Sequence, residues 1–141
     1  MKPEIKAQWV AALRSGEYKQ YRGVLTRTDD KGKPVAHCCL GVLCDLAVKA
    51  GVAAATPAEG RCVKVYHPVG TSYTASYYKD GIPFAVADDA LLPQVVVDWA
   101  GLPSSTPMVN YLAKSQSYAL TALNDHGTSF KEIADLIEKQ L

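Results

Sequence analysis

One apolar segment, Cys39 to Gly51 or one residue longer at its start, constrains the fold more than any other part of the sequence. Its apolar residues recur at helical spacing, and the stretch from Leu40 to Leu46 holds a single charge, Asp45. A helix that is apolar on most sides must be covered by other elements on most sides. The sequence therefore predicts a central helix, ended by Gly51, that is buried in the core.

A second helix is predicted at the start of the chain, from about Pro3 to Ser15. Proline suits the first position of a helix, where its missing N–H group is not needed. Glycine fits the left-handed position just past the end, and Gly16 stands there. The apolar face of this helix consists of Ile5, Trp9, Ala12 and Leu13.

The C-terminal helix has the clearest local signal. Ser129 and Glu132 have the spacing of a capping box, in which each residue satisfies the backbone of the other at the helix start. The following apolar residues form one stripe at helical spacing: Phe130, Ile133, Ala134, Ile137 and Leu141. The pattern predicts an amphipathic helix that packs on the core.

Hairpins are predicted between these helices. The segments Tyr21–Thr28 and Val35–Cys38 flank a polar turn that contains glycine and proline. The stretch Val52–Gly60 is predicted to be a loop because it is rich in small and breaker residues. Further strands are predicted at Arg61–Tyr66, Thr71–Tyr78 and Ile82–Val86, the last as an edge strand because of Pro83.

The region after these strands is harder to assign. Leu92–Trp99 is predicted to be a short helix opened by Pro93, although its three valines leave a strand open. Met108–Leu112 is ambiguous, and Ser117–Leu123 is predicted to form one or two helical turns. With strands and helices intermixed and hairpins in place of regular βαβ units, the class is α+β. We expect one domain over residues 1–141, in which a small antiparallel sheet or hairpins pack with the three helices above.

The composition excludes several classes of protein. Of 141 residues, 48% are hydrophobic and 21% are charged, which is typical of a globular chain rather than a disordered one. No stretch reaches the roughly 18 apolar residues of a membrane span. The formal net charge of +1 gives no basis for unspecific binding of extended nucleic acid.

The four cysteines are the obvious candidates for chemistry. The N-terminus has no apolar signal core, so we expect a cytosolic protein with reduced thiols. Cys38 and Cys39 stand where a helix dipole would lower a thiol pKa, and Cys39 with His126 and Asn124 could be written as a cysteine hydrolase. The simpler interpretation is that the cysteines are small core residues. Their spacing does not match a zinc site, so no metal is expected.

Arginines and tyrosines offer a different chemistry. Arginine forks onto phosphates, tyrosine faces stack on bases, and the chain has eight tyrosines but only two phenylalanines. The residues predicted to contact a small anionic ligand are Arg22, Arg27, Arg61, Tyr66 and Tyr77. The alternative is a solvated sheet face with cross-strand tyrosines. The loop Asn124–Gly127 is either a helix corner or, beside a helix N-terminus, a second place for an anion.

Three strings together carry a resemblance: WVAALRSGEYKQ near the start, CCLGVLCDLA at Cys38–Ala47, and LTALNDHGTSFKEIADLIE at Leu120–Glu138. With them the chain resembles a group of small, mostly uncharacterised proteins encoded by bacteriophages, prophages and some bacteria. The resemblance implies a phage-type accessory protein in the bacterial cytosol, and it supplies no catalytic residues.

These observations lead to one main hypothesis and two alternatives. The main hypothesis is an anti-defence protein that sequesters a small anionic ligand, such as a cyclic nucleotide immune signal. We expect it to be a homo-oligomer that is not an enzyme and needs no cofactor. One alternative is an inhibitor that binds a host defence protein directly. The other is the small cysteine hydrolase described above.

Overall fold

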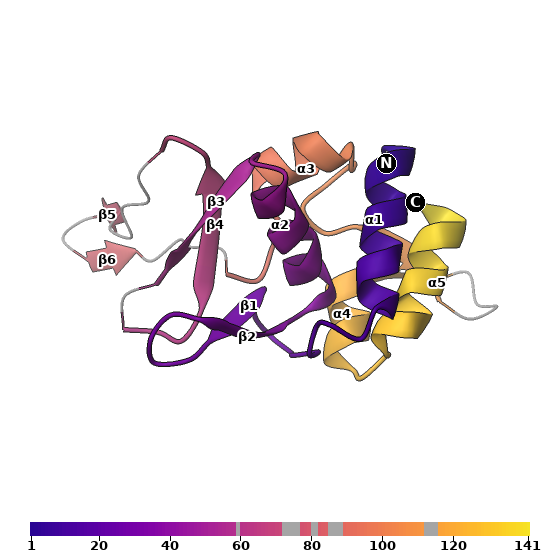
Figure 1. The fold of residues 1–141 in the computed structure, drawn as a ribbon, viewed down its shortest axis with the longest axis horizontal. Coiled ribbons are helices and arrows are strands. Elements are labelled where there is room, and N and C mark those ends of the chain that lie inside the picture. Colours follow the sequence, from indigo (N-terminus) through magenta and orange to yellow (C-terminus); the bar gives the residue numbers. More distant parts are fainter. Residues whose placement is uncertain (59, 72–76, 80–81, 85–88, 112–115) are drawn as a thin grey trace.

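The computed structural model of the chain describes residues 1–58, 60–71, 77–79, 82–84, 89–111 and 116–141. Helix α2 (Cys39–Lys49) lies in the middle of the molecule. The hairpins β3–β4 and β5–β6 lie on one side of it, and the helices α1 and α5 lie together at the opposite end (Figure 1). The α+β class predicted from the sequence is confirmed.

Helix α2 is buried as predicted. Every residue from Cys39 to Cys44 is inaccessible to solvent, and Cys38 caps the helix by accepting a hydrogen bond from the Gly41 N–H at 3.4 Å. The Trp9 indole N–H donates to the Cys39 carbonyl at 3.0 Å, so the N-terminal helix is fixed to the start of α2. The predicted central helix is therefore the structural centre of the core.

Helices α1 (Pro3–Arg14) and α5 (Phe130–Gln140) pack against each other, and both were predicted. The capping box is confirmed, since Ser129 and Glu132 each accept a hydrogen bond from the backbone of the other. On the outer surface Arg14 reaches two carboxylates of α5, Asp135 at 2.5 Å and Glu138 at 2.8 Å. Helix α1 packs on α2 and α5, whereas α5 packs on α1, on helix α4 (Leu120–Asp125) and on strand β7 (Met108–Asn110).

The first two hairpins depart in detail from the prediction. Strands β1 (Thr26–Thr28) and β2 (Pro34–His37) form the predicted pair, but β1 is shorter than predicted and β2 begins and ends one residue earlier. Strand β3 (Ala53–Pro57) lies where a loop was predicted, and it pairs with β4 (Lys64–Pro68). The loop prediction was wrong because the small residues of β3 are ordered by backbone pairing with β4, which local composition does not reveal.

The later elements mix confirmed and wrong predictions. Strand β5 (Tyr77–Lys79) pairs with β6 (Ile82–Phe84), while most of the strand predicted over Thr71–Tyr78 lies outside the described residues. Helix α3 (Gln94–Ala100) confirms the helical choice for its segment, and Gly101 ends it in a left-handed conformation. The remaining elements are β7 (Met108–Asn110), β8 (Ser117–Ala119) and α4 (Leu120–Asp125).

The helix predicted from Ser117 was wrong over its first three residues. Those residues form β8 and pair with β7, with Val109 opposite Tyr118. Pairing with the preceding strand β7 decides the conformation there, and helix α4 begins only at Leu120. Within the described ranges, no helix is long and apolar enough to cross a membrane.

His37 joins β2 to the segment before β1. Its N–H donates to the Lys19 carbonyl at 2.9 Å, and its own carbonyl accepts from Tyr21 N–H at 2.8 Å. His37 is 8% exposed, and its ring meets the ring of Tyr18 edge-on, with centroids 5.1 Å apart. Among the described residues, nothing hydrogen-bonds its Nε2 atom. Burial lowers the pKa of His37 below its ordinary value of 6.5; Asp45 opposes that shift, and Lys64 and Lys49 support it.

We expect His37 to make the fold sensitive to mild acid. Because its folded-state pKa is depressed, the unfolded chain binds more protons, and the free energy of unfolding falls as the pH drops from 6.5 through the folded-state pKa. His37→Phe keeps an aromatic ring against Tyr18 and should remove up to ~1.4 kcal/mol per pH unit from that slope. Urea unfolding between pH 7.5 and 5 measures it. His67→Gln is the control, and an equal change in its slope would contradict the assignment.

Candidate ligand-binding site

A cavity of about 350 Å³ lies where the β7–β8 hairpin meets helices α4 and α5. We call it the corner pocket, and it is lined by Tyr111, Tyr118, Ala122, Leu123, His126 and Thr128. Strand β8 and helix α4 are continuous, so they present Tyr118 and Ala122 to the same space. The size falls at the lower end of the range for small-molecule sites.

The two tyrosines form the aromatic wall of the corner pocket. Their rings meet edge to face, with centroids 6.3 Å apart and planes at 84°. The Tyr118 hydroxyl donates to the Gln116 side-chain oxygen at 3.0 Å, which holds the ring in place. With Ala122 and Leu123, the rings give a largely apolar lining that suits a flat, unsaturated ligand.

His126 supplies the polar edge of the corner pocket. Its Nδ1 atom lies 2.7 Å from the carbonyl oxygen of Ala122, one helical turn earlier. A carbonyl can only accept, so Nδ1 carries the hydrogen in this contact. In the neutral ring Nε2 is then the atom that can accept a hydrogen bond. The proton on Nδ1 therefore leaves Nε2 of the neutral ring as a hydrogen-bond acceptor.

Arg22 stands at the same corner. A side chain built on Gly127 would bring its Cβ to 3.2 Å from the Arg22 Nη2 atom, so the guanidinium lies over the residue between His126 and Thr128. Arg22 is exposed, and within the described ranges no carboxylate forms an ion pair with it. The next residue is fixed because Gly23 N–H donates to Asp125 Oδ1 at 3.1 Å.

Asn124 ties the elements around the corner together. It is fully buried, and its Oδ1 accepts from the Gln20 amide at 3.0 Å and from the Cys39 N–H at 3.2 Å. Its Nδ2 group donates to the Tyr21 carbonyl at 2.7 Å. One side chain of α4 thus positions both the segment that carries Arg22 and the start of α2.

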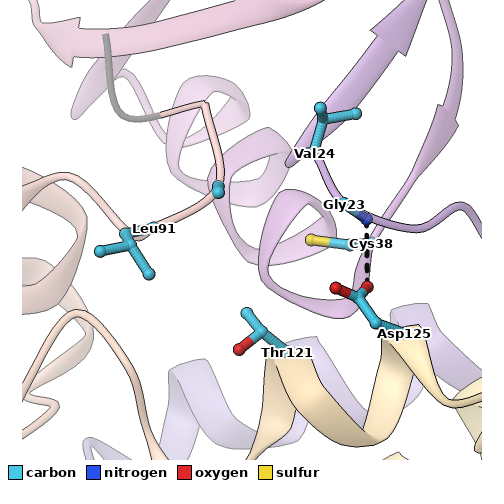
Figure 2. A pocket seen from close by; sticks show the side chains of 7 residues that line it. Gly23, Val24, Cys38, Leu91, Thr121 and Asp125 are labelled. Carbon is cyan, nitrogen blue, oxygen red and sulfur yellow. Dashed lines mark hydrogen bonds between the residues drawn. The ribbon is translucent and has the colours of Figure 1, made fainter. Parts of the chain in front are cut away.

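A smaller cavity of about 150 Å³ is lined by other residues of α4 and by Cys38, whose thiol Figure 2 shows. Thr121 and Asp125 line it from α4, and Gly23, Val24 and Leu91 line it from the loops. The pKa of Cys38 is lowered, first by the neighbouring Cys39 side chain and then by the N–H groups of Gly41 and Leu40, although burial opposes the shift. The backbone N–H groups at the helix start thus contribute to a lower pKa, but the larger cause is the Cys39 side chain, which was not predicted.

The structure does not assemble the predicted arrangement of Cys39, His126 and Asn124. Cys39 is fully buried, its thiol donates to the Leu120 carbonyl at 3.5 Å, and burial raises its pKa well above the ordinary value. The Asn124 side chain accepts a hydrogen bond from the Cys39 backbone N–H and does not orient a histidine. The His126 ring is hydrogen-bonded to the Ala122 carbonyl. A buried, protonated thiol without a base beside it is not a nucleophile, so this interpretation of Cys39 was wrong.

The comparison with protein families covers the whole chain. A family model described as a domain of unknown function, DUF8296, matches residues 1–141. The chain belongs to the DUF8296 family. No curated protein matches it, and no solved structure does. The family assignment is consistent with a group of uncharacterised proteins, and it adds no functional residue to the geometry of this DUF8296 domain.

The other predicted ligand residues lie apart from the corner pocket of the DUF8296 domain. Arg27 is stacked over the Tyr21 ring, 5.2 Å from its centroid, and donates to the Tyr21 hydroxyl at 2.9 Å. Arg61 pairs with Asp89 at 2.6 Å beside a third cavity that also contains Asp29 and Asp30. That cavity is poorly suited to an anion because two carboxylates line it.

The two predicted tyrosines also fall elsewhere. Tyr66 is 8% exposed, its hydroxyl shares a hydrogen bond of 2.6 Å with Thr26, and burial raises its pKa. It therefore belongs to the core of the DUF8296 domain. Tyr77 lies in β5, and its side chain is outside the described residues. Of the five residues, Arg22 is the one that approaches the corner pocket, because its guanidinium lies over Gly127, between His126 and Thr128. The lining residues Tyr111 and Tyr118 were not predicted.

The described cysteines and acidic residues do not suggest a metal centre. Across the described ranges, no three of His, Cys, Asp and Glu come together as a set that could hold a metal ion. All four cysteines are free, and three of them are buried. Cys62 is exposed, so the interpretation of the cysteines as core residues was wrong for Cys62 alone.

Proposed function

We propose that the protein binds a small anionic ligand in the corner pocket and acts by holding it. The observation that carries this proposal is Arg22, an exposed guanidinium with no ion pair in the described part of the chain, which lies over Gly127, between the pocket-lining residues His126 and Thr128. By contrast, Arg14 and Arg61 are neutralised by carboxylates. A free guanidinium can form two parallel hydrogen bonds to a phosphate or carboxylate group.

The cellular role that we propose is that of a phage-type accessory protein in the bacterial cytosol, which sequesters a signal such as a cyclic nucleotide. Support comes from the resemblance of the strings at Cys38–Ala47 and Leu120–Glu138 to small phage and prophage proteins. Sequestration requires only a tight site, which agrees with a pocket of aromatic and cationic groups.

A host defence protein as a direct partner has less support in the structure. Such an inhibitor needs a contiguous apolar patch. The large exposed apolar side chains among the described residues are Val35, Val69 and Met108, and they belong to three different hairpins or their ends. The ligand-binding hypothesis therefore remains the one that we propose.

The proposal predicts that Arg22→Gln weakens binding of the anion. We expect isothermal titration against a panel of mononucleotides and cyclic nucleotides to show binding by the wild-type protein. The loss of charge-assisted hydrogen bonds should weaken it by about tenfold to a hundredfold in the variant. The matched control is Arg27→Gln, which removes an exposed arginine that stacks on Tyr21.

Two results would contradict the proposal. The first is no binding by the wild-type protein to any member of the panel at high micromolar concentration. The second is an equal loss of affinity in Arg22→Gln and Arg27→Gln, which would show that general charge, and not the corner pocket, attracts the ligand. Circular dichroism checks that both variants keep the fold.

A further inference from the structure

The chemistry of the corner pocket is different on its two sides. The Tyr111 and Tyr118 rings, with Ala122 and Leu123, form an apolar wall, while His126 and Thr128 continue toward Gly127 and the guanidinium of Arg22. A ligand that fills the cavity and also reaches the guanidinium needs a flat apolar part and an anionic part. Inorganic phosphate alone would leave the aromatic wall without a contact.

His126 adds a third requirement. Its Nδ1–H group is engaged by the Ala122 carbonyl at 2.7 Å, so the neutral ring offers Nε2 as an acceptor. Within the described ranges, no hydrogen bond occupies that atom. An acceptor at the polar edge of an aromatic pocket is matched by a ring that carries an N–H group in its own plane. Ring oxygens and ring nitrogens without hydrogen would instead face the lone pair of Nε2.

We infer that the ligand is a nucleoside phosphate whose base occupies the corner pocket, with a base N–H group donated to His126 Nε2 and the phosphate on Arg22. This inference rests on the proposed function and deepens it by naming the ligand class. Bases combine a flat ring that stacks on tyrosine with in-plane N–H groups. The sugar joins the base to the phosphate, which would meet the guanidinium where it lies over Gly127.

The experiment compares the four ribonucleoside 5′-monophosphates with ribose 5-phosphate, which has the anion and the sugar but no base. We expect at least one nucleotide to bind about tenfold or more tightly than ribose 5-phosphate, because stacking and the N–H contact are lost without the base. His126→Phe keeps a ring at the position and removes Nε2, and it should reduce that preference several-fold. Arg22→Gln should weaken both kinds of ligand together.

A spectroscopic measurement on the wild-type protein distinguishes a direct contact at His126 Nε2 from a structural effect of the His126 substitution on the end of α4. In wild-type protein labelled with ¹⁵N, the Nε2 resonance of His126 should shift when the preferred nucleotide is added and stay in place with ribose 5-phosphate. The control resonance is Nε2 of His67, in β4.

Each outcome decides one of the two proposals. If ribose 5-phosphate binds as tightly as every nucleotide, the inference about the base is overturned while the proposed binding of an anion stands. If neither kind of ligand binds, the inference about the base is overturned, and the titration with cyclic nucleotides described above decides the proposed function. If a nucleotide is preferred but the His126 resonance does not move and His126→Phe keeps the preference, the assignment of the base to this pocket is wrong.

Discussion

Gly41→Ala is expected to destabilise the fold by about 4 kcal/mol or more. A Cβ atom at this position would lie 1.7 Å from the Leu25 carbonyl oxygen and 2.6 Å from its carbonyl carbon. The clash is with backbone, and that carbonyl also accepts the hydrogen bond of Cys38 N–H at 3.0 Å. Helix α2 can therefore accept a methyl group only if it moves away from the chain before β1.

The clash and helix propensity predict opposite signs for the change in stability of Gly41→Ala. Helix propensity alone predicts that alanine in place of glycine stabilises a helix by about 1 kcal/mol. Urea unfolding of Gly41→Ala separates the two expectations, since the contact predicts a large loss and propensity predicts a gain. Ala11→Gly, at an exposed position of α1, calibrates the propensity term in the same protein. A Gly41→Ala variant as stable as the wild type would show that α2 does not pack on Leu25 in this way.

The elements with local signals could be predicted from the sequence. The capping box of Ser129 and Glu132, the apolar run of α2 and the glycines that end the helices act within a few residues, so the pattern alone located those helices. Strand β3 and strand β8 could not be predicted in this way. Each is defined by backbone pairing with a partner strand, and neither has the β-branched alternation that marks a strand in a sequence.

The candidate site was harder to predict for the same reason. Arg22 was chosen because it is a cation near tyrosines in sequence, yet its place near the corner pocket depends on Gly127, which is far along the chain. Tyr66 was chosen with equal reason and proved to be a core residue. What distinguishes the two is burial and contact with distant residues, which depend on how the hairpins and helices are placed. Composition indicated the kind of chemistry, and tertiary structure decided which residues carry it.

Asn124→Leu is expected to cost about 3–5 kcal/mol of the free energy of unfolding. Leucine has a similar shape but cannot replace the four hydrogen bonds of a fully buried amide, one of which is donated to Asp125 Oδ1 at 3.2 Å. The Cys39 N–H, the Tyr21 carbonyl and the Gln20 amide would each lose a partner. Desolvated groups without partners account for most of the expected cost, because water does not reach this position.

A second variant separates the roles of the two ends of the amide. Asn124→Asp keeps oxygens that accept from Cys39 N–H and Gln20, but it places a carboxylate oxygen against the Tyr21 carbonyl where an N–H group donated at 2.7 Å. At low pH, where a protonated carboxyl can donate, we expect Asn124→Asp to lose less stability than Asn124→Leu. At neutral pH we expect it to lose more stability than Asn124→Leu. Asn110→Asp, at an exposed position of β7, is the control. If Asn124→Asp unfolds at the same urea concentration as the wild type at neutral pH, the donor end of Asn124 does not hold the Arg22 segment. The position of Arg22 at the corner pocket would then need another cause.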